Sequence, residues 1–176
     1  MGTPGYQIRT VPLHEEGGQL KAGEPEQFIK SSSSDQNPMF SPDGRWLAYQ
    51  SNESGKDEVY VRRFSSPTSA QGGKWQVSNN GGSFPHWSRT GHELIYQLGD
   101  QIMAASYTVK GDTFVADRPR VWIAKLGGTD WDLAPDGKHV AVLTPVLPEN
   151  APKEEHDVVF LENFVDELQR RVPTGK

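Results

Sequence analysis

The most direct candidate for catalysis is a serine in residues 81–85, GGSFP, near the middle of the chain. A serine hydrolase places its nucleophile in a Gly-x-Ser-x-Gly turn between a strand and a helix, because that sharp turn exposes the hydroxyl. Here Pro85 stands where the final glycine is required, and the residues that follow have a strand pattern. We therefore expect Ser83 to lie in a loop between two strands and to have no catalytic role.

Phosphotransfer and metal chemistry also lack their sequence patterns. A kinase needs a Gly-rich loop before a strand lysine, a His-Arg-Asp loop and an Asp-Phe-Gly triplet, and none of these occurs. No histidine forms a close pair with a carboxylate at helical ligand spacing; the five are His14, His86, His92, His139 and His156. The chain has no cysteine, which excludes thiolate sites and disulfides. We expect no catalytic residue, no metal and no cofactor.

A repeated segment organises the chain and must position any site. It occurs as residues 40–49 (FSPDGRWLAY), 87–96 (WSRTGHELIY) and 133–142 (LAPDGKHVAV). The shared glycines Gly44, Gly91 and Gly137 are separated by 47 and 46 residues. That period matches the roughly 40–50 residues of one blade of a β-propeller.

The physical role of the repeat is to join two antiparallel strands. Proline presets φ at the second position of the turn, aspartate tolerates the third, and glycine adopts the left-handed conformation. The residues predicted to form these turns are Pro42, Asp43, Gly44, Gly91, Pro135, Asp136 and Gly137. Three consecutive apolar residues follow each turn, as in residues 47–49, so both faces of that strand should be buried. For this reason we expect Trp46, Trp87 and Trp131 to pack in the core.

Further strand patterns between the turns give four strands per period, and the expected fold is all-β. We predict one domain over 1–176, a partial β-propeller of about three four-stranded blades. The predicted blades are 37–78, 84–124 and 130–161, preceded by two outer strands of an earlier blade at 6–30. Residues 31–35 read as a flexible linker. A short amphipathic helix is expected at 162–172, because Phe164, Val165 and Leu168 fall on one helical face.

The motif at residues 40–52, FSPDGRWLAYQSN, resembles the Pro-Asp-Gly propeller repeat of the TolB family, a WD40-like relative found in bacterial periplasmic proteins. The copy at Gly91 departs from that pattern because it lacks the proline and the aspartate. The end of the chain, from Asn163 to Lys176, is similar to the carboxyl end of bacterial serine/threonine protein kinases that carry such a propeller. The resemblance implies an extracytoplasmic location.

A binding surface is expected on the rim opposite the Pro-Asp-Gly turns, because loops on a rigid scaffold often carry function. Antiparallel strands place the loops after the second and fourth strand of each blade on that rim. The residues predicted there are Asn52, Glu53, Lys56, Asp57, Ser83, Phe84, Thr129 and Asp130.

The charge balance argues against some partners. With 18 Lys and Arg, 23 Asp and Glu and a net charge of −5, the chain has no basic footprint for nucleic acid or an anionic membrane. No apolar run has the length of a membrane span. Three blades and two strands fall short of the roughly four to eight blades of a closed propeller. Upstream blades or a second copy are therefore expected to cover the open faces, and a homodimer is one form of this.

The function expected from these observations is a non-catalytic scaffold that binds a protein partner or senses a ligand. The resemblance implies that it is the carboxyl part of a larger bacterial protein such as a receptor-like kinase. Three alternatives remain open. They are the gating propeller of a serine peptidase, a TolB-like periplasmic interaction protein, and a solute-binding propeller with carboxylates in its channel.

Overall fold

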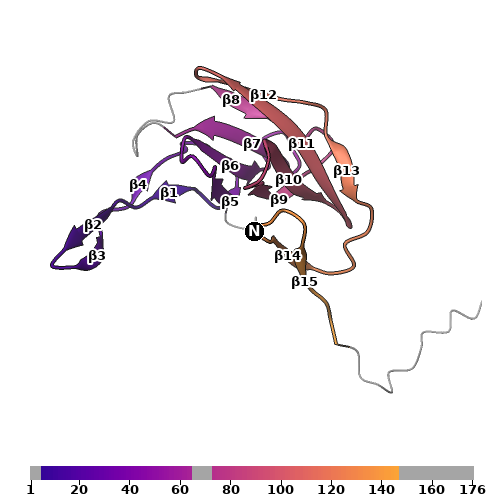
Figure 1. Ribbon diagram of the computed structural model, residues 1–176. Coiled ribbons are helices and arrows are strands. Elements are labelled where there is room, and N and C mark those ends of the chain that lie inside the picture. The colour runs from indigo at the N-terminus through magenta and orange to yellow at the C-terminus, as the bar shows by residue number, and fades with distance from the viewer. Residues whose placement is uncertain (1–4, 65–72, 147–176) are drawn as a thin grey trace, which may run out of the picture. The chain divides into compact units, whose positions relative to one another are not determined.

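Strands make up all of the regular structure in the computed structural model, which describes residues 5–64 and 73–146 (Figure 1). In chain order they are β1 (Arg9–Thr10), β2 (Leu13–Glu16), β3 (Gln19–Ala22), β4 (Glu26–Gln27), β5 (Asp35–Phe40), β6 (Trp46–Ser51), β7 (Glu58–Arg63), β8 (Lys74–Gln76), β9 (Ser83–Trp87), β10 (Glu93–Leu98), β11 (Gln101–Lys110), β12 (Thr113–Ala116), β13 (Arg120–Ile123), β14 (Asp130–Leu133) and β15 (Val140–Leu143). The predicted all-β class is confirmed. The chain divides into a unit over Met1–Thr144, which holds every described strand, and a second unit over Pro145–Lys176.

Two antiparallel sheets form the centre of the first unit. One has the strand order β5-β6-β7-β8, and the other has the order β12-β11-β10-β9, with β13 pairing with the other half of the long strand β11. The strands β5 and β9 are therefore the edge strands of their sheets. Three two-stranded sheets complete the unit: β1 with β4, β2 with β3, and β14 with β15.

Three hydrophobic clusters hold these sheets together in series. The largest contains Trp46 and Val61 of the four-stranded sheet together with Leu94 and Phe114 of the five-stranded sheet. A second cluster packs residues of the β1–β4 region on the other face of the four-stranded sheet. A third packs Trp131 of β14 against the other face of the five-stranded sheet. Both central sheets are thus covered on two faces, and every residue of β6 is buried.

The repeated turns differ in backbone conformation. The φ angles of Gly44 and Gly137 are 69° and 66°, in the left-handed region that favours glycine. Each glycine N–H donates to the carbonyl oxygen three residues earlier, at 2.8 Å on Ser41 and 2.9 Å on Ala134. Gly91 does not adopt a positive φ, and its N–H donates to the Ser88 hydroxyl at 3.2 Å. The turn at Gly91, which lacks Pro and Asp, is therefore closed by a hydrogen bond to a side chain and not to a backbone carbonyl.

The predicted propeller arrangement is wrong in the described part of the chain. One sheet has four strands, another has five, and the last has two, and these sheets do not close on one another. The spacing of the turns identified hairpins, but hairpin spacing does not determine how sheets are arranged in space. The third strand expected for the last blade and the expected helix at 162–172 both lie outside the described residues.

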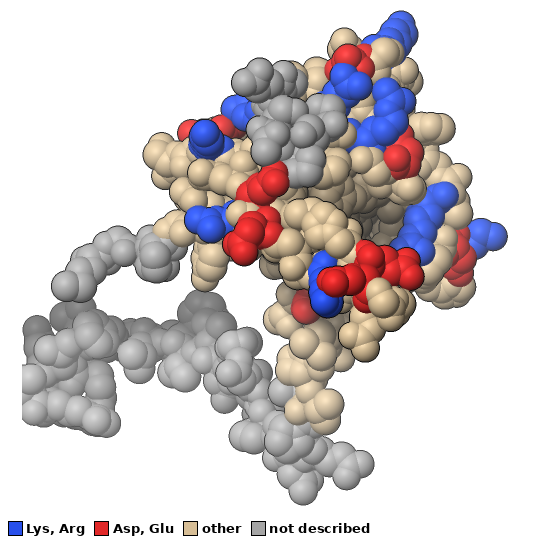
Figure 2. Space-filling view, turned by 90° about the vertical axis from the view of Figure 1, so that its left-hand side faces the viewer, with Lys and Arg blue, Asp and Glu red and all other residues tan. Residues whose placement is uncertain are grey.

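Several local features also differ from expectation. The segment 31–35 is not a free linker, because the Ser34 N–H donates to Asn52 at 2.9 Å and Asp35 is buried. The hairpin of β2 and β3 and the strand β12 were not expected. On the face shown in Figure 2, basic and acidic side chains are interspersed, and neither sign forms a continuous field.

Candidate functional site

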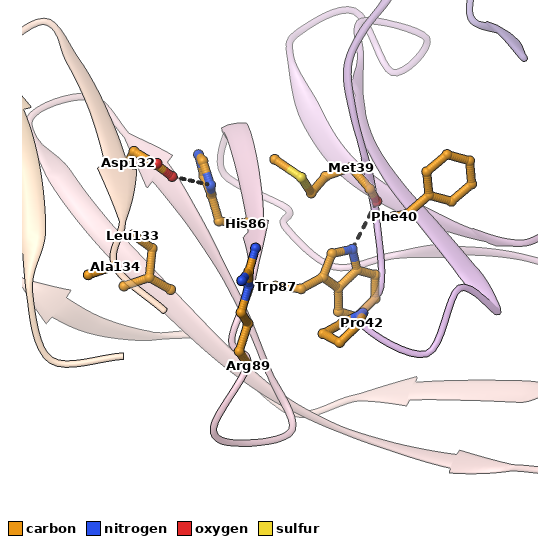
Figure 3. Close-up of a pocket in the computed structure, with 9 residues that line it drawn as sticks. All are labelled: Met39, Phe40, Pro42, His86, Trp87, Arg89, Asp132, Leu133 and Ala134. Atoms are coloured by element: carbon orange, nitrogen blue, oxygen red, sulfur yellow. Dashed lines mark hydrogen bonds and ion pairs between the residues drawn. The ribbon is translucent and has the colours of Figure 1, made fainter. Parts of the chain in front are cut away.

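A cavity of about 450 Å³ lies where the edge strands of three sheets come together (Figure 3). These are β5 of the four-stranded sheet, β9 of the five-stranded sheet and β14 of the two-stranded sheet. The residues that line the cavity come from these strands and the turns after them: Met39, Phe40, Pro42, His86, Trp87, Arg89, Asp132, Leu133 and Ala134. A concave site with apolar walls and a few polar groups is the usual form of a small-molecule site.

The repeat explains why these residues meet. Met39, His86 and Asp132 are separated by 47 and 46 residues, the same intervals that separate the glycines of the three turns. They therefore occupy the same position in three copies of one hairpin. Because the sheets pack in series, this shared position brings a methionine, a histidine and an aspartate to one cavity.

His86 has the clearest chemical capacity in the cavity. Its Nδ1 lies 3.6 Å from Oδ1 of Asp132, and its ring centroid is 4.4 Å from that of Trp131. Burial lowers the pKa of His86 below its ordinary value of 6.5, and the charges of Asp132 and Asp130 oppose this only in part. The imidazole is therefore neutral at pH 7 and can accept a proton. A neutral, half-enclosed histidine beside a carboxylate is the usual arrangement of a general base.

Backbone strain occurs beside the cavity in two of its strands. Asn37 and Phe84 have φ angles of 51° and 49°, which side chains other than glycine rarely adopt, and each precedes a proline. The pairing of β5 with β6 and of β9 with β10 shifts register at these points. Such conformations cost on the order of 1–3 kcal/mol each and cluster at functional sites. The bulges re-aim the strand segments that carry Met39 and His86.

The walls of the cavity are tied together by a hydrogen bond and by ring packing. Trp87 Nε1–H donates to the carbonyl oxygen of Met39 at 2.9 Å, which links the edges of the two central sheets. Phe40 packs edge-on against Phe64, with ring centroids 4.8 Å apart, and remains 47% exposed. Arg89 adds a cation to the lining, and it makes no ion pair within residues 5–64 and 73–146. The cavity thus combines a base, a cation and flat apolar surfaces.

The eight residues predicted for the opposite rim do not line this cavity. Residues of the β6–β7 loop form ion pairs with neighbouring strands. Glu53 pairs with Lys74, and Lys56 lies 3.4 Å from buried Glu58. The carbonyl oxygen of Asp57 accepts from Gly82 N–H at 2.9 Å.

The remaining members of the predicted rim lie at the starts of β9 and β14. The Ser83 hydroxyl is 3.5 Å from the carbonyl oxygen of Gln97, and Asp130 Oδ1 accepts from the Trp131 N–H at 2.9 Å. Thr129 N–H donates to Leu143 O at 3.1 Å, and Phe84 is 40% exposed. Their binding role stays a prediction.

The sequence-based search missed His86, Arg89 and Asp132 because it compared residues that are neighbours along the chain. His86 and Asp132 are 46 residues apart, and no catalytic motif joins them. The repeat could have predicted their proximity, because His86 and Asp132 occupy the same position in consecutive copies of the repeated segment. Among the residues that the structure describes, no group of three His, Asp or Glu could hold a metal ion. That part of the chain also has no helix with the length and hydropathy needed to cross a membrane.

No protein-family model and no curated protein matches the chain. Among solved structures, the chain is similar to the crystal structure of a candidate 6-phosphogluconolactonase from Bacteroides uniformis, with a TM-score of 0.50 and 17% sequence identity. The match covers 78% of this chain and 41% of that chain, so this chain spans less than half of the length of the similar protein. At this identity the likeness concerns the fold.

The comparisons correct two expectations. The resemblance to the TolB propeller family and to the carboxyl end of bacterial kinases is not supported, because no family model matches and the similar structure is of a differently named protein. Short turn motifs caused the error, since Ser-Pro-Asp-Gly specifies a tight hairpin in many folds. The interpretation of the chain as a non-catalytic scaffold is not supported either, because the similar structure is that of a protein named as an enzyme. That interpretation rested on contiguous motifs, which do not detect side chains that two sheets bring together.

Proposed function

We propose that the cavity at β5, β9 and β14 is the active site of a hydrolase that opens lactones, the cyclic esters of sugar acids. The observation that carries this proposal is the His86 imidazole, which burial keeps neutral and which lies 3.6 Å from Asp132 in a cavity that Arg89 also lines. Lactone opening needs a base for water and a cation for the developing oxyanion, and these three residues supply both. The name of the similar protein, a candidate 6-phosphogluconolactonase, agrees with this reaction class.

In the proposed reaction, Nε2 of His86 removes a proton from a water molecule whose oxygen attacks the lactone carbonyl carbon. The carbonyl oxygen becomes an oxyanion, which the guanidinium of Arg89 stabilises. When the carbonyl re-forms, the bond to the ring oxygen breaks and the imidazolium returns its proton to that oxygen. The product is the open-chain hydroxy acid. Asp132 lies on the Nδ1 side, where it stabilises the imidazolium that forms transiently.

The walls of the cavity suit a sugar ring. Phe40 and Trp87 present aromatic surface, and Met39, Pro42 and Leu133 add apolar contacts. The C–H faces of a pyranose ring can pack on such surfaces while its hydroxyls remain toward solvent. A volume of about 450 Å³ is within the range of ligand sites for small molecules.

The test is the rate at which the purified protein opens glucono-δ-lactone and its 6-phosphate, measured as acid release above the uncatalysed rate. We expect His86→Gln to lower kcat by about 10²–10⁴-fold, the usual contribution of a general base. The matched control is His139→Gln, because His139 also contacts a carboxylate, Asp136, at 2.6 Å but lies outside the cavity. A rate no greater than the uncatalysed one for both lactones, or equal activity of His86→Gln and His139→Gln, would show that the proposal is wrong.

The pH dependence gives a second test. Since the neutral imidazole is the active form, kcat/KM should fall as pH drops through the pKa of His86, which burial places below 6.5. The charge of Asp132 raises this pKa, so Asp132→Asn should move the acidic limb to still lower pH. A limb that does not move on this substitution would remove Asp132 from the proposed mechanism.

A further inference from the structure

The hairpin of β2 and β3, residues 13–22, forms an arm whose two strands pair with each other and with no other described strand (Figure 1). Every residue of these two strands is exposed. A two-stranded hairpin is at best marginally stable in water by itself. We propose that a second copy of this chain covers the arm, and that each copy places its arm in a groove of the other. The proposal goes beyond lactone hydrolysis and does not depend on it.

The register of the arm separates an apolar face from a polar face. Glu15 lies opposite Leu20, and Leu13 lies two residues before Glu15 on the same strand. Partners across an antiparallel pair share a face, as do alternate residues along a strand, so these three side chains lie on one face. The ion pair between Lys21 and Glu16, at 2.6 Å, lies on the other face. Leu13 and Leu20 are 63% and 73% exposed, so the apolar face is uncovered in a single copy.

A groove beside the arm is also apolar and also uncovered. It is a cavity of about 230 Å³ between the segment 8–12, which contains β1, and the strands β5 and β6. Seven of its nine lining residues are apolar, and two of them, Val11 and Phe40, are 44% and 47% exposed. The volume is below the roughly 300–1,000 Å³ of small-molecule sites. The groove therefore suits inserted side chains better than a whole ligand.

Each of these two apolar surfaces carries one charge, and the two charges have opposite signs. Glu15 lies on the apolar face of the arm, and Arg9 lines the groove. Within the part of the chain that the structure describes, neither residue forms an ion pair. An arm that enters the groove of another copy can pair its Glu15 with the Arg9 of that copy. Opposite charges at such positions fix the register and orientation of an interface.

The presence of both surfaces on one chain favours a second copy as the occupant. In a two-fold dimer, the same surface of both subunits forms the interface, so each arm must find its groove on the partner. Pro12 lines the groove and directly precedes the arm. Where the chain leaves the arm, Gly23 N–H donates to Pro12 O at 2.8 Å. Arm and groove are therefore adjacent, and a two-fold axis near Pro12 places each arm against the groove of the other copy.

The size of this interface indicates how tightly the two copies associate. The arm comprises residues 13–22, and nine residues line the groove. This is at or below the lower end of the roughly 20–30 residues that each side of a standard interface contributes. Small interfaces belong to weak and reversible complexes. We therefore expect a monomer–dimer equilibrium with a dissociation constant in the micromolar range.

Sedimentation velocity of the full chain from about 1 to 500 µM measures this equilibrium, and the mean mass should rise from that of a monomer toward that of a dimer. Leu20→Gln should weaken association at least tenfold, because each dimer loses two buried leucine side chains. The matched control is Leu143→Gln. Leu143 is 63% exposed and lies on β15, outside the arm and the groove, so this substitution should leave the dissociation constant unchanged.

Charge reversal tests whether Glu15 and Arg9 meet between copies. Glu15→Arg and Arg9→Glu should each weaken association at least tenfold, because like charges then face each other twice in every dimer. An equimolar mixture of these two variants should associate as the parent does, because each substituted position then faces the opposite charge on the other copy. A contact within one copy cannot produce this rescue in the mixture.

Three results would overturn the proposal. They are a parent protein that stays monomeric at about 500 µM, a dimer that Leu20→Gln does not weaken, and a mixture of the two charge variants that associates no better than either variant alone. A monomeric parent would mean that the occupant of the groove is not a second copy. Lactone turnover is measured separately, so either proposal can fail alone.

Discussion

Replacing Gly137 with alanine tests whether the turn after β14 packs on the turn after β9. Gly44 offers a matched reference, because its φ of 69° is close to the 66° of Gly137. A Cβ on Gly44 would meet no atom within 4 Å, whereas a Cβ on Gly137 would lie 2.6 Å from the hydroxyl oxygen of Thr90. The two substitutions therefore share the same backbone strain and differ in one contact.

The expected losses in the free energy of unfolding follow from the backbone strain and from the contact with Thr90. Placing alanine in the left-handed region costs about 1–2 kcal/mol, and this is the whole effect expected for Gly44→Ala. Overpacking in a tight site typically costs about 1–3 kcal/mol, and the short side chain of Thr90 can relieve part of it by rotating. We therefore expect Gly137→Ala to destabilise the protein by about 1 kcal/mol more than Gly44→Ala.

Urea unfolding of the parent, both single variants, Thr90→Ala and the double variant Thr90→Ala/Gly137→Ala measures these differences. Removing the Thr90 hydroxyl should recover the extra loss, so the double variant should be more stable than the sum of the two single effects by about 1 kcal/mol. Equal midpoints for the two glycine variants, or strictly additive losses in the double variant, would refute the contact between Gly137 and Thr90.

Three further predictions concern the core and its buried polar groups. Phe114 is 1% exposed and packs among four aromatic residues, Trp46, Trp75, Trp87 and Tyr107. Phe114→Ala should lower the free energy of unfolding, measured in urea, by about 3–5 kcal/mol. A loss below about 1 kcal/mol would show that Phe114 lies outside the core. Burial raises the pKa of Tyr49 and Tyr96 to about 12, so the stability that depends on their protonated forms is intact below pH 10 and is lost as pH rises toward 12. Phenolate absorbance from Tyr49 and Tyr96 should appear only as the pH approaches 12, and titration of either residue near pH 10 would contradict this. Ser78→Ala removes the hydroxyl that donates to buried Glu58, and it should cost about 2–4 kcal/mol by leaving that carboxylate short of a partner, whereas Ser54→Ala on the surface should be near neutral.

Local features were predictable from the sequence because their causes are local. The Pro-Asp-Gly turns follow from the φ preferences of three consecutive residues, and burial of both faces of β6 follows from three apolar residues in a row. The sequence also contains a pattern that predicts the hairpin of β2 and β3, although the hairpin was not expected. Gly17 and Gly18 both have positive φ between the two strands, as a two-residue hairpin turn requires, but the exposed strands carry no apolar alternation.

The arrangement of the sheets and the site could not be predicted in the same way. The order of sheets depends on which faces pack, and Phe114, in the unexpected strand β12, supplies much of the contact between the two central sheets. His86 and Asp132 are unremarkable at their own positions. They become a candidate base only because two sheets pack so that equivalent edge positions meet, which is a property of tertiary structure.

The serial packing of the sheets means that the strands carrying His86 and Asp132 differ in their stability against local unfolding. His86 belongs to β9, whose sheet is covered on both faces, whereas Asp132 belongs to the two-stranded sheet of β14 and β15, which one cluster attaches to the rest of the unit. Sheets with one covered face open by local unfolding more readily than sheets with two. Opening of β14 and β15 would separate Asp132 from His86 while the central sheets stay folded. Amide hydrogens of β14 should therefore exchange faster than those of β10, and heating should lower the activity at a temperature below the one that unfolds the core.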